Sequence, residues 1–273
     1  MHVPVANDRK FWVDTVWNYG YLAIFAIVGV SLNIVILKGL GAESLGIFNQ
    51  IYAVFVIAGQ FVVLGLHDSA QKHTAEFFNS PSEQAALSIA ALIPALLFGS
   101  VGAIVLALLS SWIGQLAQSE SVGRGIFLMA PGLVLFSVNK VLMSILNGKR
   151  HMVAFALGQS LRAVCILLVS VIIVFYNWHS YNFGISFTAA EIVLLCFLIV
   201  IVKPVQFQSV QVRKAIEWLV RHITFGSQAL VHGFLAEAFL RIDIIMLGIF
   251  VSDRQVGVYS FISMLVEGTY QVS

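Results

Sequence analysis

Charged residues are scarce in this chain. Only 10% of its 273 residues are Asp, Glu, Lys or Arg, whereas 59% are hydrophobic, and the mean hydropathy is +0.94. A soluble domain carries about 25% charged residues, and no water-soluble fold could hide this much apolar surface. The scarcity of charge therefore excludes a soluble protein and predicts an all-α, polytopic transmembrane helix bundle.

The chain also lacks the features of most enzymes. Its loops are too short to hold a soluble catalytic domain, and it has neither a Gly-rich phosphate loop nor a nucleophile elbow. We expect no enzymatic activity, no catalytic residue, no cofactor and no nucleic-acid partner. The two cysteines, Cys165 and Cys196, fall inside apolar runs and are interpreted as packing residues. His67, Asp68 and His73 have no further ligands nearby, so they are interpreted as a solvated cytoplasmic loop rather than a metal site.

Long apolar runs are abundant. About 20 apolar residues span a bilayer as a helix, and in lipid the backbone must satisfy its own hydrogen bonds. The sequence predicts seven complete transmembrane helices and the start of an eighth near Val256. The predicted spans are 16–37, 45–66, 86–109, 125–146, 152–175, 183–202 and 224–250.

The distribution of Lys and Arg predicts the orientation. With the N-terminus in the cytoplasm, nine basic residues flank the spans on the inner side and three on the outer side. Short loops rich in Lys and Arg stay in the cytoplasm. We therefore expect a cytoplasmic N-terminus.

One interhelical segment differs from the others. Between 203 and 223, apolar residues recur at helical spacing with Arg213, Lys214, Glu217 and Arg221 between them. The pattern predicts an amphipathic helix on the cytoplasmic membrane surface. It divides the chain into a six-helix lobe (1–203), a linker helix (204–223) and the beginning of a second lobe (224–273).

A short internal similarity supports this division. Leu45-Gly46-Ile47-Phe48 and Val256-Gly257-Val258-Tyr259 align at an offset of 211 residues, and each follows a predicted outer loop. Parallel repeats of six helices recur in transporters. If the repeat is real, the seventh helix corresponds to the first, and we expect most of the second half to be absent from this chain.

Several motifs together resemble one transporter family. The run from Leu40 to Phe48, followed by Gly65-Leu66 and Ala70-Gln71-Lys72, is similar to the first two helices of polysaccharide flippases. Asn147-Gly148-Lys149-Arg150 resembles their cytoplasmic turn after the fourth helix. The segments 241–248 and 256–260 resemble their seventh and eighth helices. The resemblance covers roughly residues 10–273.

These flippases belong to the multidrug/oligosaccharidyl-lipid/polysaccharide superfamily. The resemblance implies two six-helix lobes around a central cavity, which move undecaprenyl-pyrophosphate-linked oligosaccharide across the bacterial inner membrane by alternating access. It implies the lipid bilayer, an anionic lipid-linked sugar, the missing second half and polysaccharide-assembly proteins as partners. Because this chain stops within the eighth helix, we expect an N-terminal portion of such a protein.

Charges inside the spans are the candidate site residues. A charge near mid-bilayer costs roughly 2.5–3.5 kcal/mol, so such groups normally face a wet cavity or one another. Arg162 lies near mid-membrane and shares a helix face with Gly158 and Gln159. We expect Arg162 and Gln159 to line the cavity; the alternative is a structural ion pair of Arg162 with Glu191, Glu237 or Glu267.

The other charged residues inside the spans each have two interpretations. Lys140 is a second cavity candidate, although it lies close enough to the inner surface to snorkel. Glu237 and Arg241 are four residues apart, so they either neutralise each other or form a switched pair that lines the cavity. Asp243 points elsewhere and is expected to contact a neighbouring helix or to snorkel outward. Glu191 and Glu267, like Glu237, are candidates for protonation coupled to transport, against an interhelical hydrogen bond.

Two other functions compete with the flippase. A multidrug or small-cation antiporter of the same superfamily would need acidic cavity residues, whereas Lys140, Arg162 and Arg241 favour an anionic substrate. A membrane-embedded glycosyl- or phospho-transferase would need clustered carboxylates in a loop, and Glu120 and Asp253 are isolated in the sequence.

Overall fold

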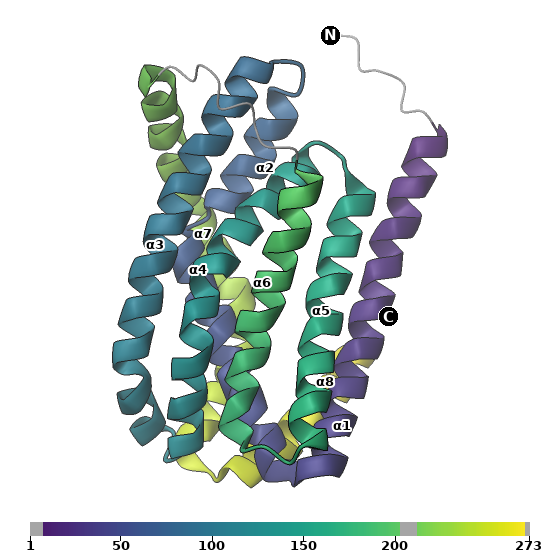
Figure 1. Ribbon diagram of the computed structural model, residues 1–273, viewed down its shortest axis with the longest axis vertical. Coiled ribbons are helices and arrows are strands. Elements are labelled where there is room, and N and C mark those ends of the chain that lie inside the picture. Colours follow the sequence, from purple (N-terminus) through teal and green to yellow (C-terminus); the bar gives the residue numbers. More distant parts are fainter. Residues whose placement is uncertain (1–7, 203–211, 271–273) are drawn as a thin grey trace.

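The protein is a bundle of long α-helices. The computed structural model describes residues 8–202 and 212–270, and the side chains of 8, 9 and 267–270 lie outside that description. The prediction of an all-α transmembrane bundle is confirmed for the part of the chain described (Figure 1). The elements are α1 (Asp8–Val63), α2 (Leu66–Glu76), α3 (Pro81–Leu116), α4 (Glu120–Gly148), α5 (Met152–Phe175), η1 (Ser180–Asn182), α6 (Phe183–Ile201), α7 (Val212–Phe250) and α8 (Asp253–Tyr270).

The first helix is two antiparallel arms. A straight helix of 56 residues would be about 84 Å long, far more than the roughly 30 Å of a bilayer core. Gly41 has φ 86°, which favours glycine, and the chain reverses there. Asn49 on the second arm donates to Asn33 on the first at 3.5 Å, so the arms lie side by side. The two arms correspond to the first two predicted spans.

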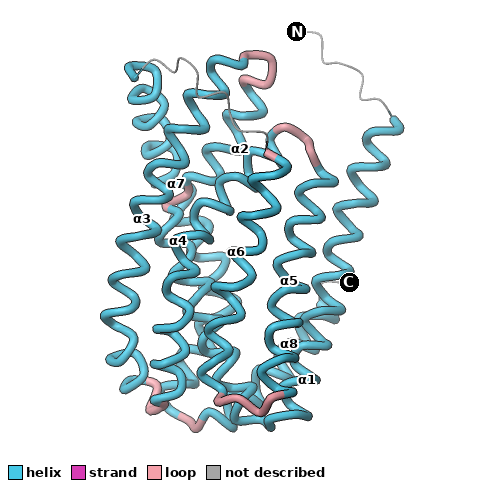
Figure 2. Tube along the Cα trace, in the orientation of Figure 1, coloured by secondary structure: helices cyan, strands magenta, loops and turns pink. Residues whose placement is uncertain are grey.

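The turns gather at the two ends of the bundle (Figure 2). One end, which we call the Arg150 end, holds the turns at 77–80 and 149–151 together with the start of α1, and Arg150 pairs there with Asp14 at 3.0 Å. The other, the Gly41 end, holds the turns at 117–119, 176–179 and 251–252. The inner and outer flanks expected from the sequence thus lie at opposite ends. A cytoplasmic Arg150 end remains a prediction.

Helices of membrane length make this a multi-pass membrane protein. Five helices in the described ranges are long and apolar enough to cross a bilayer: α1, α3, α4, α5 and α6 with η1. Their outward faces carry exposed apolar side chains such as Leu97 and Leu108 on α3. In water such a surface would be unstable, but in a bilayer it contacts lipid. The more polar α7 and α8 are not among the five.

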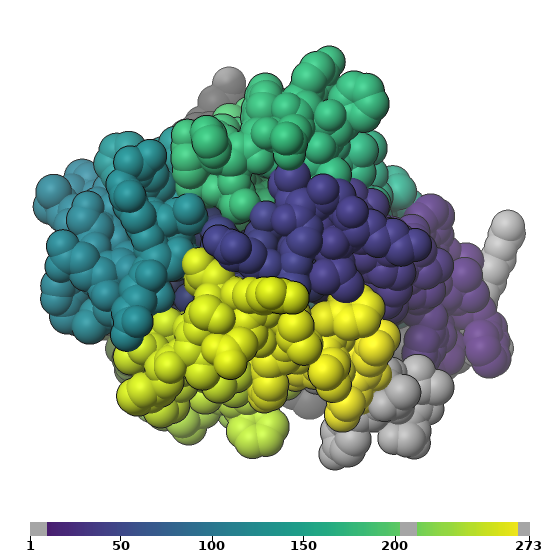
Figure 3. All heavy atoms as spheres, turned by 90° about the horizontal axis from the view of Figure 1, so that it is seen from below, coloured from purple at the N-terminus to yellow at the C-terminus, as the bar shows by residue number. Residues whose placement is uncertain are grey.

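Aromatic residues fill the core between the second arm of α1, α4 and α6. Phe187 stacks on Tyr52 with ring centroids 5.8 Å apart, and it also contacts Phe48 and Phe55. Phe136 of α4 packs edge-on against Phe55 at 5.2 Å. These contacts hold the second arm at the centre of the molecule. Figure 3, viewed from the Gly41 end, shows the residues around 40–50 lying between α8 and the 176–182 connection.

Residues 212–223, the second part of the predicted linker, form the start of α7. Residues 203–211 of the predicted linker lie outside the described residues, and from Val212 the helix continues without a break to Phe250. Trp218 is buried against Ala86, Leu87 and Ala90 of α3. Its indole Nε1 donates to Glu83 at 2.8 Å. The apolar side of this segment thus packs on protein, because α2 and α3 offer it a matching surface.

The internal similarity has a structural counterpart at the Gly41 end. A Cβ on Gly46 would overlap the carbonyl oxygen of Asp253, and a Cβ on Gly257 would overlap that of Ala42. Asn49 donates to Ser260 at 2.9 Å. Residues 42 and 253, 46 and 257, and 49 and 260 are each 211 positions apart. The contact between the second arm and α8 is therefore reciprocal, as a two-fold relation between repeats requires.

Candidate functional site

A buried ion pair links α5 to α6. Arg162 Nε lies 2.9 Å from Glu191 Oε1, and its Nη2 lies 3.3 Å from Glu191 Oε2. Asn139 of α4 donates to the same carboxylate at 2.8 Å and to the Glu191 carbonyl at 2.9 Å. Gln159 Oε1 accepts from Arg162 Nη1 at 3.5 Å. The Glu191 side chain is only 1% exposed, so the network lies inside the bundle.

A cavity role for Arg162 stays a prediction, and the structure shows an internal partner for its guanidinium. Its guanidinium fork faces a carboxylate of its own chain, which leaves it less able to hold an anionic substrate. The structure has the pair with Glu191 that the sequence offered as the alternative. The buried Glu191 carboxylate accepts hydrogen bonds from Asn139 on α4 and from Arg162 on α5, so it joins α6 to both helices. Breaking such a buried pair on one side typically costs about 3–5 kcal/mol.

A second polar group lies between α7 and the second arm of α1. Glu237 accepts a hydrogen bond from Gln60 at 3.3 Å. One turn further along α7, the Arg241 guanidinium lies over the Tyr52 ring, 4.9 Å from its centroid. Glu237 and Arg241 share a helix face, yet no ion pair joins them in the described structure; each instead contacts α1.

Arg241 keeps free donors. Its Nε is buried and has no hydrogen-bond partner among the described residues. A buried donor without a partner costs about 1–3 kcal/mol or more, and its cation is stabilised by the Tyr52 ring. Arg241 is therefore a span cation whose Nε could donate to an additional acceptor.

Lys140 lies between the two polar groups. Its Nζ is 5.4 Å from the centroid of the Phe136 ring, and Arg162 lies 5.3 Å from the same ring. It is within electrostatic reach of Glu237 on α7 and of Glu191 on α6. The structure thus gathers Lys140, Arg162, Gln159 and Glu191 on one side of this interior, with Glu237 and Arg241 on α7 facing α1.

The sequence interpretation of His67 and Asp68 as a loop was wrong. Leu64 and Gly65 have positive φ, of 50° and 67°, so the chain turns there and continues as helix α2. His67 Nε2 lies 3.4 Å from Asp68 Oδ1, and Lys140 is within electrostatic reach of both. The His67 side chain is 15% exposed and that of Asp68 is 43% exposed, so only His67 faces the interior. In the sequence, Gly65-Leu66 indicates the end of a helix. That a second helix, α2, begins directly after it depends on the packing of α2 against α4 and α7.

The remaining span carboxylates differ in their surroundings. Asp243 accepts from the Tyr259 hydroxyl of α8 at 2.7 Å, which confirms the expected contact with a neighbouring helix. The side chain of Glu267 lies outside the described part of the structure. Within the described ranges, no group of three His, Cys, Asp or Glu residues is arranged to hold a metal ion.

Comparisons with known proteins give the fold. No protein-family profile matches the chain, and no curated protein sequence does. Its fold is similar to that of solved transporters described as MATE or MOP-superfamily proteins. An inward-facing multidrug-resistance transporter of this kind superposes with a TM-score of 0.71 at 15% identity, covering 87% of this chain and 56% of that one.

Two further solved structures agree. A eukaryotic MATE transporter gives a TM-score of 0.61 at 13% identity, covering 90% of this chain and 58% of its own. A MOP-superfamily transporter from Pyrococcus furiosus, described as having a binding pocket of reversed polarity, gives 0.61 at 14% identity, with 93% and 62% covered. The chain thus spans about three fifths of the length of these transporters. At such identities the likeness establishes the fold alone.

Proposed function

We propose that this chain is part of a membrane translocase that moves an anionic, lipid-linked saccharide across the bacterial inner membrane by alternating access, with its N-terminus in the cytoplasm. The observation that carries the proposal is Arg241. It is a cation inside the bundle whose Nε has no partner in the described structure. Lys140, a second interior cation, has no ion-pair partner within salt-bridge distance there either.

The chemistry of the substrate class matches these groups. A guanidinium holds pyrophosphate oxygens through paired donors, and a lysine adds a point charge. The undecaprenyl tail expected from the family resemblance can stay in lipid, because the outward faces of the helices are apolar. Only the polar head group then needs a protein-lined path. Glu237, which Gln60 contacts from α1, is the carboxylate best placed to exchange a proton as the two helices move.

Binding of undecaprenyl pyrophosphate to the protein in lipid nanodiscs, followed by native mass spectrometry, tests the proposal. Arg241→Ala should weaken binding about tenfold or more, since a hydrogen bond to a charged group contributes roughly 1.5–3 kcal/mol. Arg241→Lys should retain part of the affinity. Arg213→Ala is the matched control, because Arg213 is 90% exposed and pairs only with Glu217 on its own helix. Unchanged binding by Arg241→Ala would refute the assignment.

A second candidate is a multidrug or small-cation antiporter. The interior also holds carboxylates, with Glu237, Glu191 and Asp68 within electrostatic reach of Lys140, and two of the transporters above are described as MATE transporters. This candidate predicts that ethidium binds and that Glu237→Gln abolishes its binding. The flippase proposal predicts that Glu237→Gln leaves pyrophosphate binding intact.

A further inference from the structure

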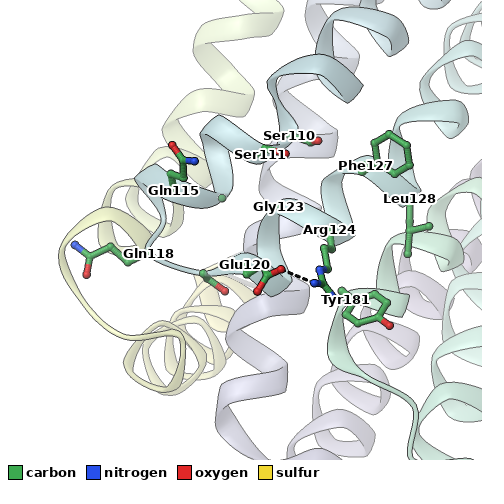
Figure 4. A pocket seen from close by; sticks show the side chains of 12 residues that line it. Ser110, Ser111, Gln115, Gln118, Glu120, Gly123, Arg124, Phe127, Leu128 and Tyr181 are labelled. Atoms are coloured by element: carbon green, nitrogen blue, oxygen red, sulfur yellow. Dashed lines mark hydrogen bonds and ion pairs between the residues drawn. The ribbon is translucent and has the colours of Figure 1, made fainter.

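Two adjoining cavities open at the Gly41 end, away from the interior charges. The first, of about 630 Å³, lies between the end of α3 and the start of α4 (Figure 4). The second, of about 490 Å³, lies between α1, the start of α4 and the connection from α5 to α6. They share Glu120, Arg124 and Tyr181, so we describe them together as the Gly41-end groove. Each volume is within the range of small-molecule sites.

The lining of the groove is polar, with two carboxylates against one fixed cation. Its carboxylates are Glu43 and Glu120, and its only fixed cation is Arg124, which pairs with Glu120. No lysine lines either cavity. A phosphate or another anion would meet an excess of carboxylate there, whereas a neutral polyol could use both donors and acceptors. The remaining hydrogen-bonding residues are Ser110, Ser111, Gln115, Gln118, Ser119, Ser121, Asn177, Trp178, His179, Ser180 and Tyr181.

Aromatic rings line one side of the groove. His179 stacks on Tyr181 with centroids 5.4 Å apart and an interplanar angle of 16°, and the Arg124 guanidinium lies 5.7 Å from the Tyr181 ring. Trp178, which also lines the groove, is 47% exposed. Figure 4 shows Arg124 between the Glu120 carboxylate and the Tyr181 ring. A planar ring beside fixed hydrogen-bonding groups suits a pyranose, which has an apolar C–H face and polar edges.

The connection that carries these rings is held in place. Ser44 of α1 and Ser180 form a hydrogen bond of 2.7 Å, and Asn182 donates to the His179 carbonyl at 2.9 Å. The next residue, Phe183, is fully buried and packs edge-on against Phe48 at 5.6 Å. Fixed side chains lose little entropy on binding, so the groove is organised before a ligand arrives.

We infer that the Gly41-end groove binds neutral saccharide units through Tyr181, Trp178 and the Glu120–Arg124 pair. The inference deepens the proposed function and rests on it for the source of the sugar: the groove lies at the end expected to face outward, where a translocated head group would emerge. The interior site would hold the pyrophosphate and the groove would hold part of the glycan.

Saturation-transfer difference NMR on the chain in lipid nanodiscs tests the groove directly. Nanodiscs are needed because maltoside detergents carry sugar head groups that would compete. The probes are maltotriose and chitotriose, with triethylene glycol as a polyether lacking hydroxyl-bearing rings. We expect transfer to the ring protons of at least one trisaccharide. Tyr181→Ala and Trp178→Ala should each weaken binding about twofold to tenfold, the usual effect of losing one aromatic contact.

Trp112→Ala is the matched control, since Trp112 is 57% exposed on α3 and does not line the groove. Circular dichroism establishes folding, and Glu120→Gln with Trp178→Ala replaces the Tyr181 variant if that variant unfolds. Absence of transfer to both trisaccharides, equal loss in Trp112→Ala, or binding of tetraethylammonium in place of sugar would overturn the inference. Failure here leaves undecaprenyl-pyrophosphate binding at Arg241 intact, and failure there leaves trisaccharide binding intact, so the two proposals are separable.

Discussion

The carboxylate of Glu191 determines what Arg162 can do. Glu191 lies on α6 and accepts hydrogen bonds from Arg162 and Asn139, so the guanidinium of Arg162 is paired with α6. Arg241 has no such carboxylate in the described structure and faces an aromatic ring on another element. Both arginines lie in apolar runs, but they differ in their capacity to bind a further acceptor, because among the described residues only Arg162 is paired with a carboxylate.

Removing one side of the Arg162–Glu191 pair should destabilise the bundle. Arg162→Ala leaves a carboxylate that is 1% exposed without its cation, and we expect a loss of about 3–5 kcal/mol. The double variant Arg162→Met, Glu191→Leu should lose less than the sum of the singles. Thermal unfolding in nanodiscs measures this, with Arg213→Ala as an exposed-pair control expected to cost under about 1 kcal/mol. Wild-type stability in Arg162→Ala would contradict the structural role.

His222 gives the docking of α7 a pH dependence. Its Nε2–H donates to the Leu87 carbonyl at 3.0 Å and its Nδ1 accepts from the Ser69 hydroxyl at 2.8 Å, with the His73 ring 6.0 Å away. Burial lowers the pKa of His222 from 6.5 to about 4, opposed by the Leu87 bond and assisted by His73. Docking is thus at full strength above pH 6.5 and weakens as the pH falls toward 4, because only undocked His222 takes up a proton.

Hydrogen–deuterium exchange across 212–226 measures that dependence. Correcting rates for the intrinsic effect of pH, we expect protection to fall between about pH 6.5 and pH 4. His222→Gln keeps one donor and one acceptor and does not titrate, so most of the pH dependence should disappear in that variant. Equal pH dependence in both proteins would assign the effect to another group, His73 first.

At the scale of elements, hydrophobic length predicts the spans well. The predicted 86–109, 125–146, 152–175 and 183–202 fall within or closely match α3, α4, α5 and α6. Membrane length is a property of consecutive residues, so the sequence contains it. The joining of 212–223 to α7, and the extension of α2 beyond Gly65, depend on surfaces supplied by α2, α3 and α7. Those surfaces exist only in the fold.

Site residues follow the same division. A charge in an apolar run is conspicuous in the sequence. The residues that stand out in this way are Lys140, Arg162, Glu191, Glu237 and Arg241. The sequence alone does not show which of Glu191, Glu237 and Glu267 pairs with Arg162, because the pairing depends on how α5 and α6 pack. The groove at the Gly41 end was missed altogether, because its residues lie in ordinary polar turns and only their convergence from α1, α3, α4 and the 176–182 connection marks them.

The contact between the second arm of α1 and α8 should tolerate no side chain at its glycines. In Gly257→Leu, the new side chain would overlap the Ala42 carbonyl, and in Gly46→Leu that of Asp253. We expect each to separate the helices, with a cost of about 1–3 kcal/mol as for overpacking. Cross-linking of Asn49→Cys with Ser260→Cys should fall in either variant. Gly20→Leu, with no atom within 4 Å of its Cβ position, is the control; equal cross-linking in all three would contradict the close contact.

At the scale of the whole molecule, the two ends of the bundle should face different compartments. We expect Arg150→Cys to resist an impermeant thiol reagent applied to intact cells and Asn177→Cys to react, because basic flanks stay in the cytoplasm. Both are made in a Cys165→Ser, Cys196→Ser background, since those are the two free cysteines. Permeabilised cells supply the control for reactivity. Labelling of position 150 from outside would reverse the orientation.

The second arm of α1, together with the turn that follows it, makes close backbone crossings with α8 and with α7. Gly46 meets Gly257 near the Gly41 end, and Gly65 meets the backbone of Gly226 toward the Arg150 end. The two glycines, Gly46 and Gly65, are 19 residues apart in the sequence, or about 28 Å along a helix, close to the roughly 30 Å thickness of the hydrocarbon. A tilt of about 10° around Gly46 would carry Gly65 about 5 Å from Gly226. A small rotation about the Gly46–Gly257 contact would therefore break the Gly65–Gly226 contact.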